Sequence, residues 1–261
     1  MAFTLITGAS SGIGEVFARR LAEKKHDLVL VARSEKKLHE LCDELMLKHK
    51  IIAHYVALDL SQPGADARLF AETEKHGFEI DWLINNAGFG SMGDFAELPL
   101  ERELEMIDLN CRALVALTHR YLPQMRERKR GTIINTSSTI SFQPLPFMST
   151  YAASKAFVTA FSEGIAEENR PYGILVMALC PGATETNFFA AAEIAEPFKM
   201  KGLQTAEQVV DAALRGVERK KTRVISGAIN KIVAYAATIT PNKLITRVIG
   251  GAIRGRLGKK Q

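Results

Sequence analysis

The 261-residue chain has only three cysteines and no apolar run approaching the roughly 18 residues of a membrane-spanning helix. Its longest apolar candidates, residues 173–180 and 232–239, have the length of a strand or a short helix. The cysteines are odd in number and widely spaced without a metal-binding or redox pattern, so we interpret them as reduced thiols. A strand pattern begins within three residues of Met1, which leaves no room for a signal peptide. These absences predict a cytoplasmic protein.

Acidic residues are missing from the last segment of the chain. Residues 219–261 contain eleven Lys or Arg and no Asp or Glu, whereas residues 1–218 contain 23 basic and 29 acidic residues, a net charge of −6. The acidic body argues against a nucleic-acid-binding protein. Pro241 and Asn242 can start a basic helix with one apolar stripe. That helix could pack on its own protein or a partner subunit, lie on an anionic membrane surface, or dock an acidic partner.

Strand and helix patterns alternate along the chain. Val-, Ile- and Leu-rich runs typical of buried parallel strands lie at residues 3–6, 27–32, 51–58, 81–85, 132–135, 174–179 and 222–226. Helical patterns lie between them at residues 15–24, 35–48, 65–76, 101–128, 151–169 and 205–218. This alternation predicts an α/β Rossmann-type fold with a doubly wound, seven-stranded parallel sheet in one domain. We expect that domain to span residues 1–226 and a basic helical extension to span residues 227–261.

A glycine-rich octet follows the first strand, reading Thr7-Gly8-Ala9-Ser10-Ser11-Gly12-Ile13-Gly14. Strand, glycine turn and helix in this order present a helix N-terminus to a pyrophosphate, and glycines let the backbone approach it. Taken alone, the octet could equally be a turn that binds nothing. The residues expected to contact the dinucleotide here are Gly8, Ser10, Ser11, Gly12, Ile13 and Gly14.

The ends of the next three strands bear on the choice of cofactor. An acid at the end of the second strand would bind the ribose 2′-hydroxyl of NAD, but this chain has Ala32 followed by Arg33. A guanidinium can pair with a 2′-phosphate, so NADP(H) is favoured over NAD(H). Polar and then small residues at the following strand ends suit an adenine and a ribose: Asp59, Leu60, Asn86, Ala87 and Gly88. Asn86 could equally be a buried amide that ties adjacent strands together.

Tyr151 and Lys155 stand four residues apart in a helical pattern and therefore share one face. Ser138 lies thirteen residues upstream, at the end of a strand, from where it can meet Tyr151 over a bound substrate. The spacing alone is weak evidence for catalysis, because it also arises by chance.

Together, these motifs resemble the short-chain dehydrogenase/reductase family of about 250 residues. The resemblance covers roughly residues 1–226 and rests on Thr7–Gly14, Asn85-Asn86-Ala87-Gly88, Asn110, Ser138, Tyr151-x-x-x-Lys155 and Pro181-Gly182. It implies hydride transfer between a nicotinamide and a carbonyl/alcohol carbon. It also implies a homodimer or homotetramer that pairs through the helices at 101–128 and 151–169.

The resemblance assigns roles to the site residues. Tyr151 would be the general acid/base, Ser138 would hold the substrate oxygen, and Asn110 would support a water leading to Lys155. The nicotinamide would be held by Pro181, Gly182, Thr184 and Thr186. A free tyrosine has a pKa near 10, and a Lys155 ammonium would favour the tyrosinate and lower that pKa. Lys155 is also expected to bind the nicotinamide ribose, and we expect no metal.

Apolar segments near these motifs suggest the substrate. Residues 187–203 include Phe188 and Phe189 and could form a lid that excludes water. No ionic group is prominent for gripping a carboxylate or phosphate, so we expect an apolar ketone or alcohol. Two alternatives stay open at this point: a 3-oxoacyl thioester reductase of lipid metabolism, and a regulatory protein that binds NADPH without turnover.

Overall fold

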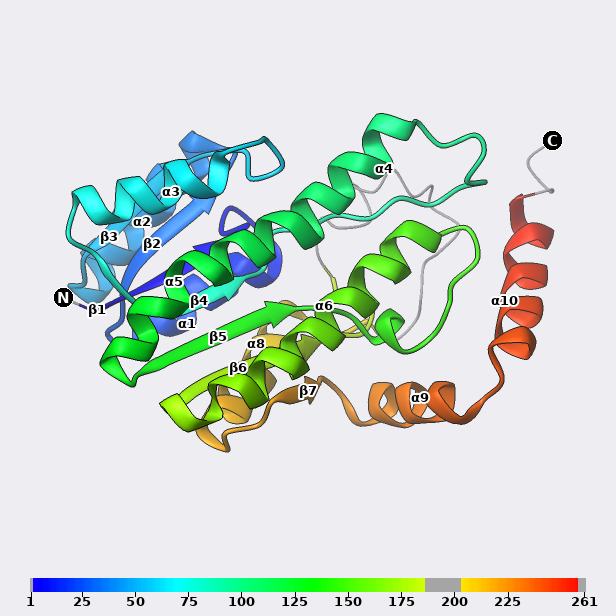
Figure 1. Ribbon diagram of the computed structural model, residues 1–261. Coiled ribbons are helices and arrows are strands. Elements are labelled where there is room, and N and C mark those ends of the chain that lie inside the picture. Colours follow the sequence, from blue (N-terminus) through cyan, green and yellow to red (C-terminus); the bar gives the residue numbers. More distant parts are fainter. Residues whose placement is uncertain (1, 186–202, 258–261) are drawn as a thin grey trace.

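The computed structural model describes residues 2–185 and 203–257, and the structural statements below refer to these residues. Its centre is a sheet of seven parallel strands in the order β3-β2-β1-β4-β5-β6-β7 (Figure 1). The strands are β1 (Ala2–Thr7), β2 (Asp27–Ala32), β3 (Ala53–Ala57), β4 (Glu79–Asn85), β5 (Gly131–Thr136), β6 (Ile174–Cys180) and β7 (Arg223–Ile225). This confirms the predicted Rossmann-type fold.

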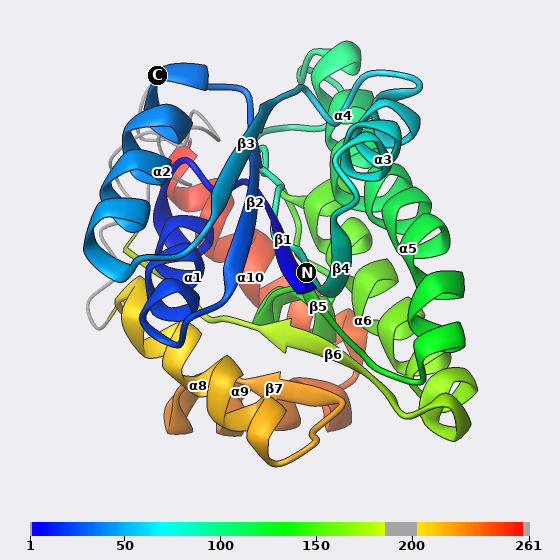
Figure 2. The same ribbon diagram turned by 90° about the vertical axis from the view of Figure 1, so that its left-hand side faces the viewer.

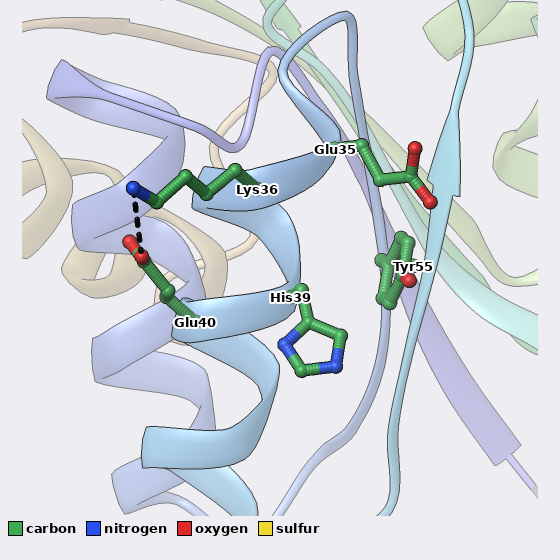
Figure 3. Close-up of a pocket in the computed structure, with 5 residues that line it drawn as sticks. All are labelled: Glu35, Lys36, His39, Glu40 and Tyr55. Carbon is green, nitrogen blue, oxygen red and sulfur yellow. Dashed lines mark ion pairs between the residues drawn. The ribbon is translucent and has the colours of Figure 1, made fainter.

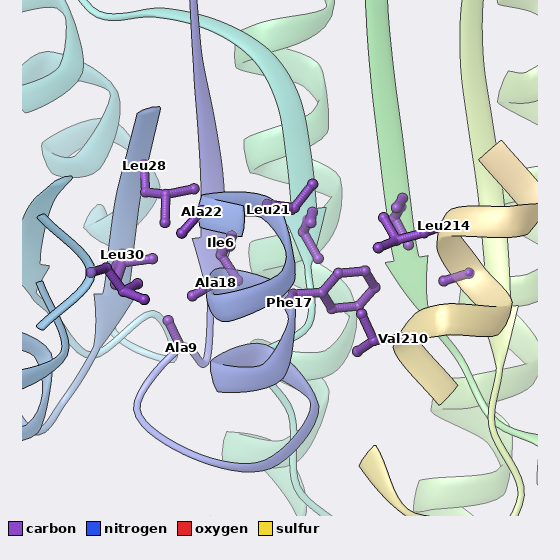
Figure 4. Close-up of a cluster of buried hydrophobic side chains, with 14 of the residues drawn as sticks. Ile6, Ala9, Phe17, Ala18, Leu21, Ala22, Leu28, Leu30, Val210 and Leu214 are labelled. Atoms are coloured by element: carbon purple, nitrogen blue, oxygen red, sulfur yellow. The ribbon is translucent and has the colours of Figure 1, made fainter. Parts of the chain in front are cut away.

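Helices cover both faces of the sheet, as buried parallel strands require. One face carries α1 (Gly12–Glu23), α2 (Glu35–His49) and α8 (Ala206–Glu218). The other carries α3 (Ala65–Lys75), α4 (Leu100–Ile107), α5 (Leu114–Arg128) and α6 (Ser149–Asn169) (Figure 2). On the first face, Phe17 of α1 is fully buried with Ile6 of β1 and Val210 of α8 (Figure 4). Burial of these side chains fixes α1, and with it the glycine turn, against the sheet.

The long helix expected at residues 101–128 contains an irregular turn. The helix runs from Leu100 to Arg128, but residues Asp108–Ala113 between α4 and α5 form a π-helical turn. A π-helical turn accommodates one extra residue and often occurs at functional sites. The helix predicted at 101–128 is therefore present, and the π-helical turn that holds Asn110 is a detail that the pattern did not indicate.

Two helices follow β7. The helix expected to begin at Asn242 is present as α10 (Asn242–Leu257), and it is preceded by α9 (Ala228–Ile239). Ala234 of α9 packs against Ala178 and Cys180 of β6, and α10 stands beyond the carboxyl ends of the strands (Figure 1). None of the described helices is both long and apolar enough to cross a membrane.

Candidate active site

The glycine turn after β1 is built for close contact. Gly8 has a φ of +66°, and a Cβ on it would stand 2.9 Å from the Cα of Ala87. A Cβ on Gly14 would collide with the carbonyl oxygen of Gly8. The N-cap residue of α1, Ser11, makes no capping hydrogen bond with its side chain. The first N–H groups of α1 are therefore not capped by Ser11 and can serve an anion.

Thr7 and Asn86 join the ends of β1 and β4. The Thr7 hydroxyl accepts hydrogen bonds from the backbone N–H groups of Asn86 and Ala87, both at 2.9 Å. In return, the side-chain amide of Asn86 donates to the Thr7 carbonyl at 3.1 Å. Asn86 is thus the inter-strand tie that the sequence left as an alternative. The role of Thr7 was not predicted, because its hydroxyl acts on residues almost eighty positions away.

Arg33 lies just after β2 with 68 % of its side chain exposed. Its Nη1 is 3.7 Å from Oε1 of Glu105 on α4. Asp59 follows β3 and accepts hydrogen bonds from the backbone N–H and hydroxyl of Ser61 at 3.0 and 2.7 Å. Burial opposes ionisation of Asp59, but these bonds and the Arg33 charge keep the pKa of its carboxyl below the ordinary value. Arg33 therefore faces two carboxylates, and a 2′-phosphate would have to compete with them.

Ser138, Tyr151 and Lys155 meet beyond the carboxyl end of β5. All three are buried, and the Ser138 hydroxyl is hydrogen-bonded to Tyr151. Ser138 also caps a short 3-10 helix, Thr139–Phe142, by accepting the N–H of Ile140 at 3.2 Å. The structure thus brings together the three side chains that the sequence grouped.

Lys155 is held away from bulk water. Its Nζ donates to the carbonyl of Thr136 at 2.8 Å and lies 5.7 Å from the centre of the Tyr151 ring. Burial lowers the pKa of Lys155 to about 8. Burial also raises the pKa of Tyr151 to about 12, although the bond with Ser138 opposes this. Desolvation of the phenolate thus dominates the pKa of Tyr151 in the protein without cofactor, and its lowering by Lys155 and a bound nicotinamide cation stays a prediction.

Asn110 is buried in the π-helical turn and binds two other segments. Its Oδ1 accepts the backbone N–H of Phe89 at 3.2 Å, and its Nδ2 donates to the Phe89 carbonyl at 3.0 Å. The same Nδ2 donates to the hydroxyl of Ser154 at 3.1 Å. Gly88 is required beside it, since a Cβ there would stand 2.7 Å from Asn110 Oδ1. Ser154 was not predicted as a site residue, although it precedes Lys155 on α6.

The segment after β6 lies beside this cluster. The carbonyl of Pro181 accepts the N–H of Thr139 at 2.9 Å, which joins the segment to the Ser138 turn. Thr184 donates its hydroxyl to the Gly182 carbonyl at 2.9 Å. A Cβ on Gly182 would collide with Asn230 of α9, so the start of the extension supports this segment. The expected contacts of Thr186, Phe188 and Phe189 fall outside the described residues.

Surface hollows among the described residues include two that lie outside the catalytic cluster. One, of about 450 Å³, lies around the start of α4 and is lined by Ser91, Met92, Leu98, Pro99, Glu101, Arg102 and Glu105. The other, of about 500 Å³, lies between α2 and β3 and is lined by Glu35, Lys36, His39, Glu40 and Tyr55 (Figure 3). Neither is lined by Ser138, Tyr151 or Lys155.

A family profile described as short chain dehydrogenase matches residues 2–197. The protein belongs to the short-chain dehydrogenase/reductase family. It is 30 % identical over 99 % of its length to a very-long-chain 3-oxoacyl-CoA reductase of Mus musculus, of which it covers 83 %. It is 32 % identical over 87 % of its length to a 7beta-hydroxysteroid dehydrogenase of Mediterraneibacter gnavus, of which it covers 86 %.

Solved structures agree with this assignment. A short-chain dehydrogenase from Sphingobium yanoikuyae, determined in complex with NADPH, superposes with a TM-score of 0.81 at 32 % identity and covers 99 % of this chain and 96 % of its own. A 7beta-hydroxysteroid dehydrogenase structure gives a TM-score of 0.85 at 29 % identity and covers 95 % and 96 % of the two chains. The chain is thus an oxidoreductase of this family.

Proposed function

We propose that the protein is an NADP(H)-dependent oxidoreductase that interconverts an apolar carbonyl compound and its alcohol. The observation that carries this proposal is the buried cluster of Ser138, Tyr151 and Lys155 beyond the carboxyl end of β5. Binding of a dinucleotide alone would not need a buried phenol bonded to a serine hydroxyl. That argues against the alternative of a regulatory protein without turnover.

The residues around the glycine turn fit a dinucleotide. A Cβ at Gly8 or Gly14 would fill the space beside the backbone, and the α1 N-terminus is not capped by Ser11. We assign the pyrophosphate to this turn, the adenosine to Arg33, Asp59 and Leu60, and the nicotinamide to Pro181, Gly182 and Thr184. When bound, the nicotinamide supplies or accepts the hydride. Support for NADP(H) comes from Arg33 and from the NADPH complex of the Sphingobium relative.

The chain's own groups manage the proton and the substrate oxygen. In reduction, the Tyr151 hydroxyl delivers its proton to the oxygen that develops negative charge, and Ser138 donates a hydrogen bond to the same oxygen. Lys155 places a positive charge near the phenol whenever it is protonated, which favours loss of the tyrosine proton. Asn110 positions Ser154 and the Phe89 backbone. We propose that it also supports a water molecule that leads to Lys155.

An apolar substrate suits the surroundings of Tyr151. The phenol packs with Phe89, Met106 and Met148 in a hydrophobic cluster, and Leu145 and Met92 lie against it. Two relatives carry names that specify very-long-chain 3-oxoacyl-CoA and hydroxysteroid substrates, and the acyl chain of the first and the steroid rings of the second are apolar. The mouse relative favours the 3-oxoacyl thioester alternative within the same reaction class.

A substrate panel tests the proposal. Aliphatic, aromatic and steroid ketones and 3-oxoacyl thioesters are offered with NADPH, and loss of NADPH absorbance is followed. We expect turnover by the wild type, loss of at least about a thousandfold in Tyr151→Phe, and no loss in Tyr235→Phe, which alters an exposed tyrosine of α9. Equal turnover by Tyr151→Phe would refute the assigned acid. A wild type that turns over only thioesters would select the alternative substrate.

The outer faces of α4 and α6 support a homo-oligomer. Leu100, Leu104 and Ile107 follow one face of the α4 helix and are each more than 40 % exposed, as is Phe157 of α6. Exposed apolar side chains grouped in this way are typical of an interface. We propose that two copies pair through these helices.

The extension after residue 226 supports the site and offers a second apolar surface. Asn230 lies against Gly182, and a Cβ on Gly250 of α10 would meet Pro146 at 3.5 Å. On the outside of α9, Ile229 and Ile239 are 77 % and 85 % exposed, in a segment that has basic and no acidic residues.

We propose that residues 1–226 form the catalytic domain of a cytoplasmic enzyme and that residues 227–261 also touch anionic membrane surfaces. The free state of Cys42, Cys111 and Cys180 supports a reducing compartment.

A further inference from the structure

Three metal-ligating side chains meet between β3 and α3, away from the catalytic cluster. His54 is the second residue of β3. Glu72 and His76 lie one turn apart at the carboxyl end of α3. One ligand atom from each residue lies within 4.8 Å of the other two. Across residues 2–185 and 203–257, no other group of three such residues meets this condition.

The surroundings hold the three side chains in place. His76 Nε2 is 2.9 Å from Glu72 Oε1, and the centres of the His54 and His76 rings are 4.7 Å apart. Both rings rest on Phe78: His54 meets it edge-on at 5.4 Å and His76 stacks on it at 5.1 Å. One aromatic ring thus contacts both imidazoles, and the His76 imidazole is hydrogen-bonded to the Glu72 carboxylate.

This donor set has the chemistry of a zinc site. Zn²⁺ takes imidazole nitrogens and carboxylate oxygens at about 2.0–2.2 Å, which puts tetrahedral ligand atoms about 3.3 Å apart. His76 stands at the end of α3 and is partly exposed, so a side-chain rotation can close the remaining gap.

We propose that His54, Glu72 and His76 bind a divalent transition-metal ion of the Zn²⁺ type, with water completing the coordination. The site is structural. Phe78 immediately precedes the amino end of β4, whereas Tyr151 and the glycine turn lie at the carboxyl ends of the strands. An ion there would join the edge strand β3 to the helix that covers it, and this stabilises the folded state by the ion's binding energy.

The positive charge of Lys75 should weaken metal binding at this site. Its Nζ is 3.7 Å from the same Glu72 oxygen, and its side chain is largely exposed. The ammonium therefore competes with a cation for Glu72, yet it can swing into solvent when an ion binds. Removing its charge should tighten metal binding.

The proposal is tested by zinc titration of the full-length chain, without a histidine tag and after chelator treatment. Calorimetry should show one Zn²⁺ per chain, and Co²⁺ should give the visible absorption bands of a tetrahedral nitrogen–oxygen site. His54→Ala and His76→Ala should each weaken Zn²⁺ binding at least about tenfold. Lys75→Ala should strengthen it by about two- to fivefold, the effect of removing one exposed charge.

The chain offers a matched control on the other side of β3. His39 of α2 faces Tyr55 (Figure 3). It pairs with Asp43 one turn later at 3.3 Å, but it belongs to no group of three metal-ligating residues among those that the structure describes. His39→Ala should leave zinc affinity unchanged. Saturating Zn²⁺ should raise the melting temperature of the wild type and His39→Ala by about 5 °C and leave His54→Ala unchanged.

Three results would overturn the proposal. They are the absence of saturable Zn²⁺ binding, an equal loss in His39→Ala and His54→Ala, and a stoichiometry unaffected by His54→Ala and His76→Ala. None of these readouts uses turnover, so they are independent of the proposed oxidoreductase activity.

Discussion

Burial favours the neutral forms of both Tyr151 and Lys155, which lie one turn apart on α6. It raises the pKa of Tyr151 to about 12 and lowers the pKa of Lys155 to about 8. The proposed proton-transfer site thus keeps both groups in an environment that disfavours their ionised forms. This arrangement lowers the stability of the free protein.

We therefore expect Lys155→Met to stabilise the protein while it abolishes activity. Below pH 8, Lys155 is charged in both the folded and the unfolded protein, and its burial reduces the free energy of unfolding. Removing the charge should raise that free energy by about 2 kcal/mol at pH 7, or the melting temperature by about 5 °C. Calorimetry of the two proteins measures the difference.

The stability difference between the wild type and Lys155→Met should depend on pH. Because the folded pKa lies below the unfolded value, the unfolded state binds more protons between about pH 8 and pH 10.5, and the wild type gains stability as pH rises through that range. The advantage of Lys155→Met should shrink accordingly. An advantage that is constant from pH 7 to pH 10 would show that lost packing or hydrogen bonding, and not charge, separates the two proteins.

We expect Arg33 to bind the 2′-phosphate of NADP(H). Loss of a charge-assisted pair costs about 1.5–3 kcal/mol, so Arg33→Ala should weaken NADPH binding by about ten- to a hundredfold and NADH binding by little. Fluorescence titration with both cofactors measures this. Parallel losses for NADPH and NADH would remove Arg33 from that role.

Glu105 should have the opposite effect on the same selectivity. Its carboxylate lies 3.7 Å from Arg33 and would repel a phosphate placed there. We expect Glu105→Gln to strengthen NADPH binding a few-fold and to leave NADH binding unchanged. A decrease in NADPH affinity would mean that Glu105 positions Arg33 and does not compete with the ligand.

The apolar face of α4 should hold two copies together. Leu104 is 50 % exposed there, and Leu104→Arg would place a charge in the proposed interface. Light scattering at micromolar concentration should show an oligomer for the wild type and a monomer for the variant. Leu47→Arg, at an exposed leucine on α2, is the matched control and should stay oligomeric.

The outer face of α9 should bind anionic lipid. We expect the protein to co-sediment with phosphatidylserine vesicles at low salt, and Ile229→Asp combined with Ile239→Asp to abolish the binding. The same double variant should keep its activity on a water-soluble ketone. Failure of the wild type to bind at any salt concentration would contradict a membrane contact.

Local patterns predicted much of this molecule. The β2 boundaries follow from an apolar run between polar residues. Ser138 follows β5, and the helix spacing of Tyr151 and Lys155 places both on the face of α6 that is buried near it. Patterns could not show contacts between distant residues. The Thr7 hydroxyl acts on β4, and nothing in the run from 228 to 239 shows that Asn230 supports Gly182. Nor can local sequence show which of two opposing effects sets the pKa of Tyr151, since that depends on its burial.

The π-helical turn at Asp108–Ala113 constrains the length of its helix. Each residue of an α-helix advances the chain by about 100° around the axis. Deleting one residue from this turn would restore regular winding and leave the two flanking halves in phase, because the wider turn absorbs one extra residue. The bonds of Asn110 to the Phe89 backbone, which depend on the turn, would be lost. Deleting one residue from the regular part of α5 would instead rotate the remainder of its buried face by that angle relative to the sheet. The fold should therefore tolerate a shortening inside the π-helical turn, at the expense of the Asn110 contacts, better than the same shortening within α5.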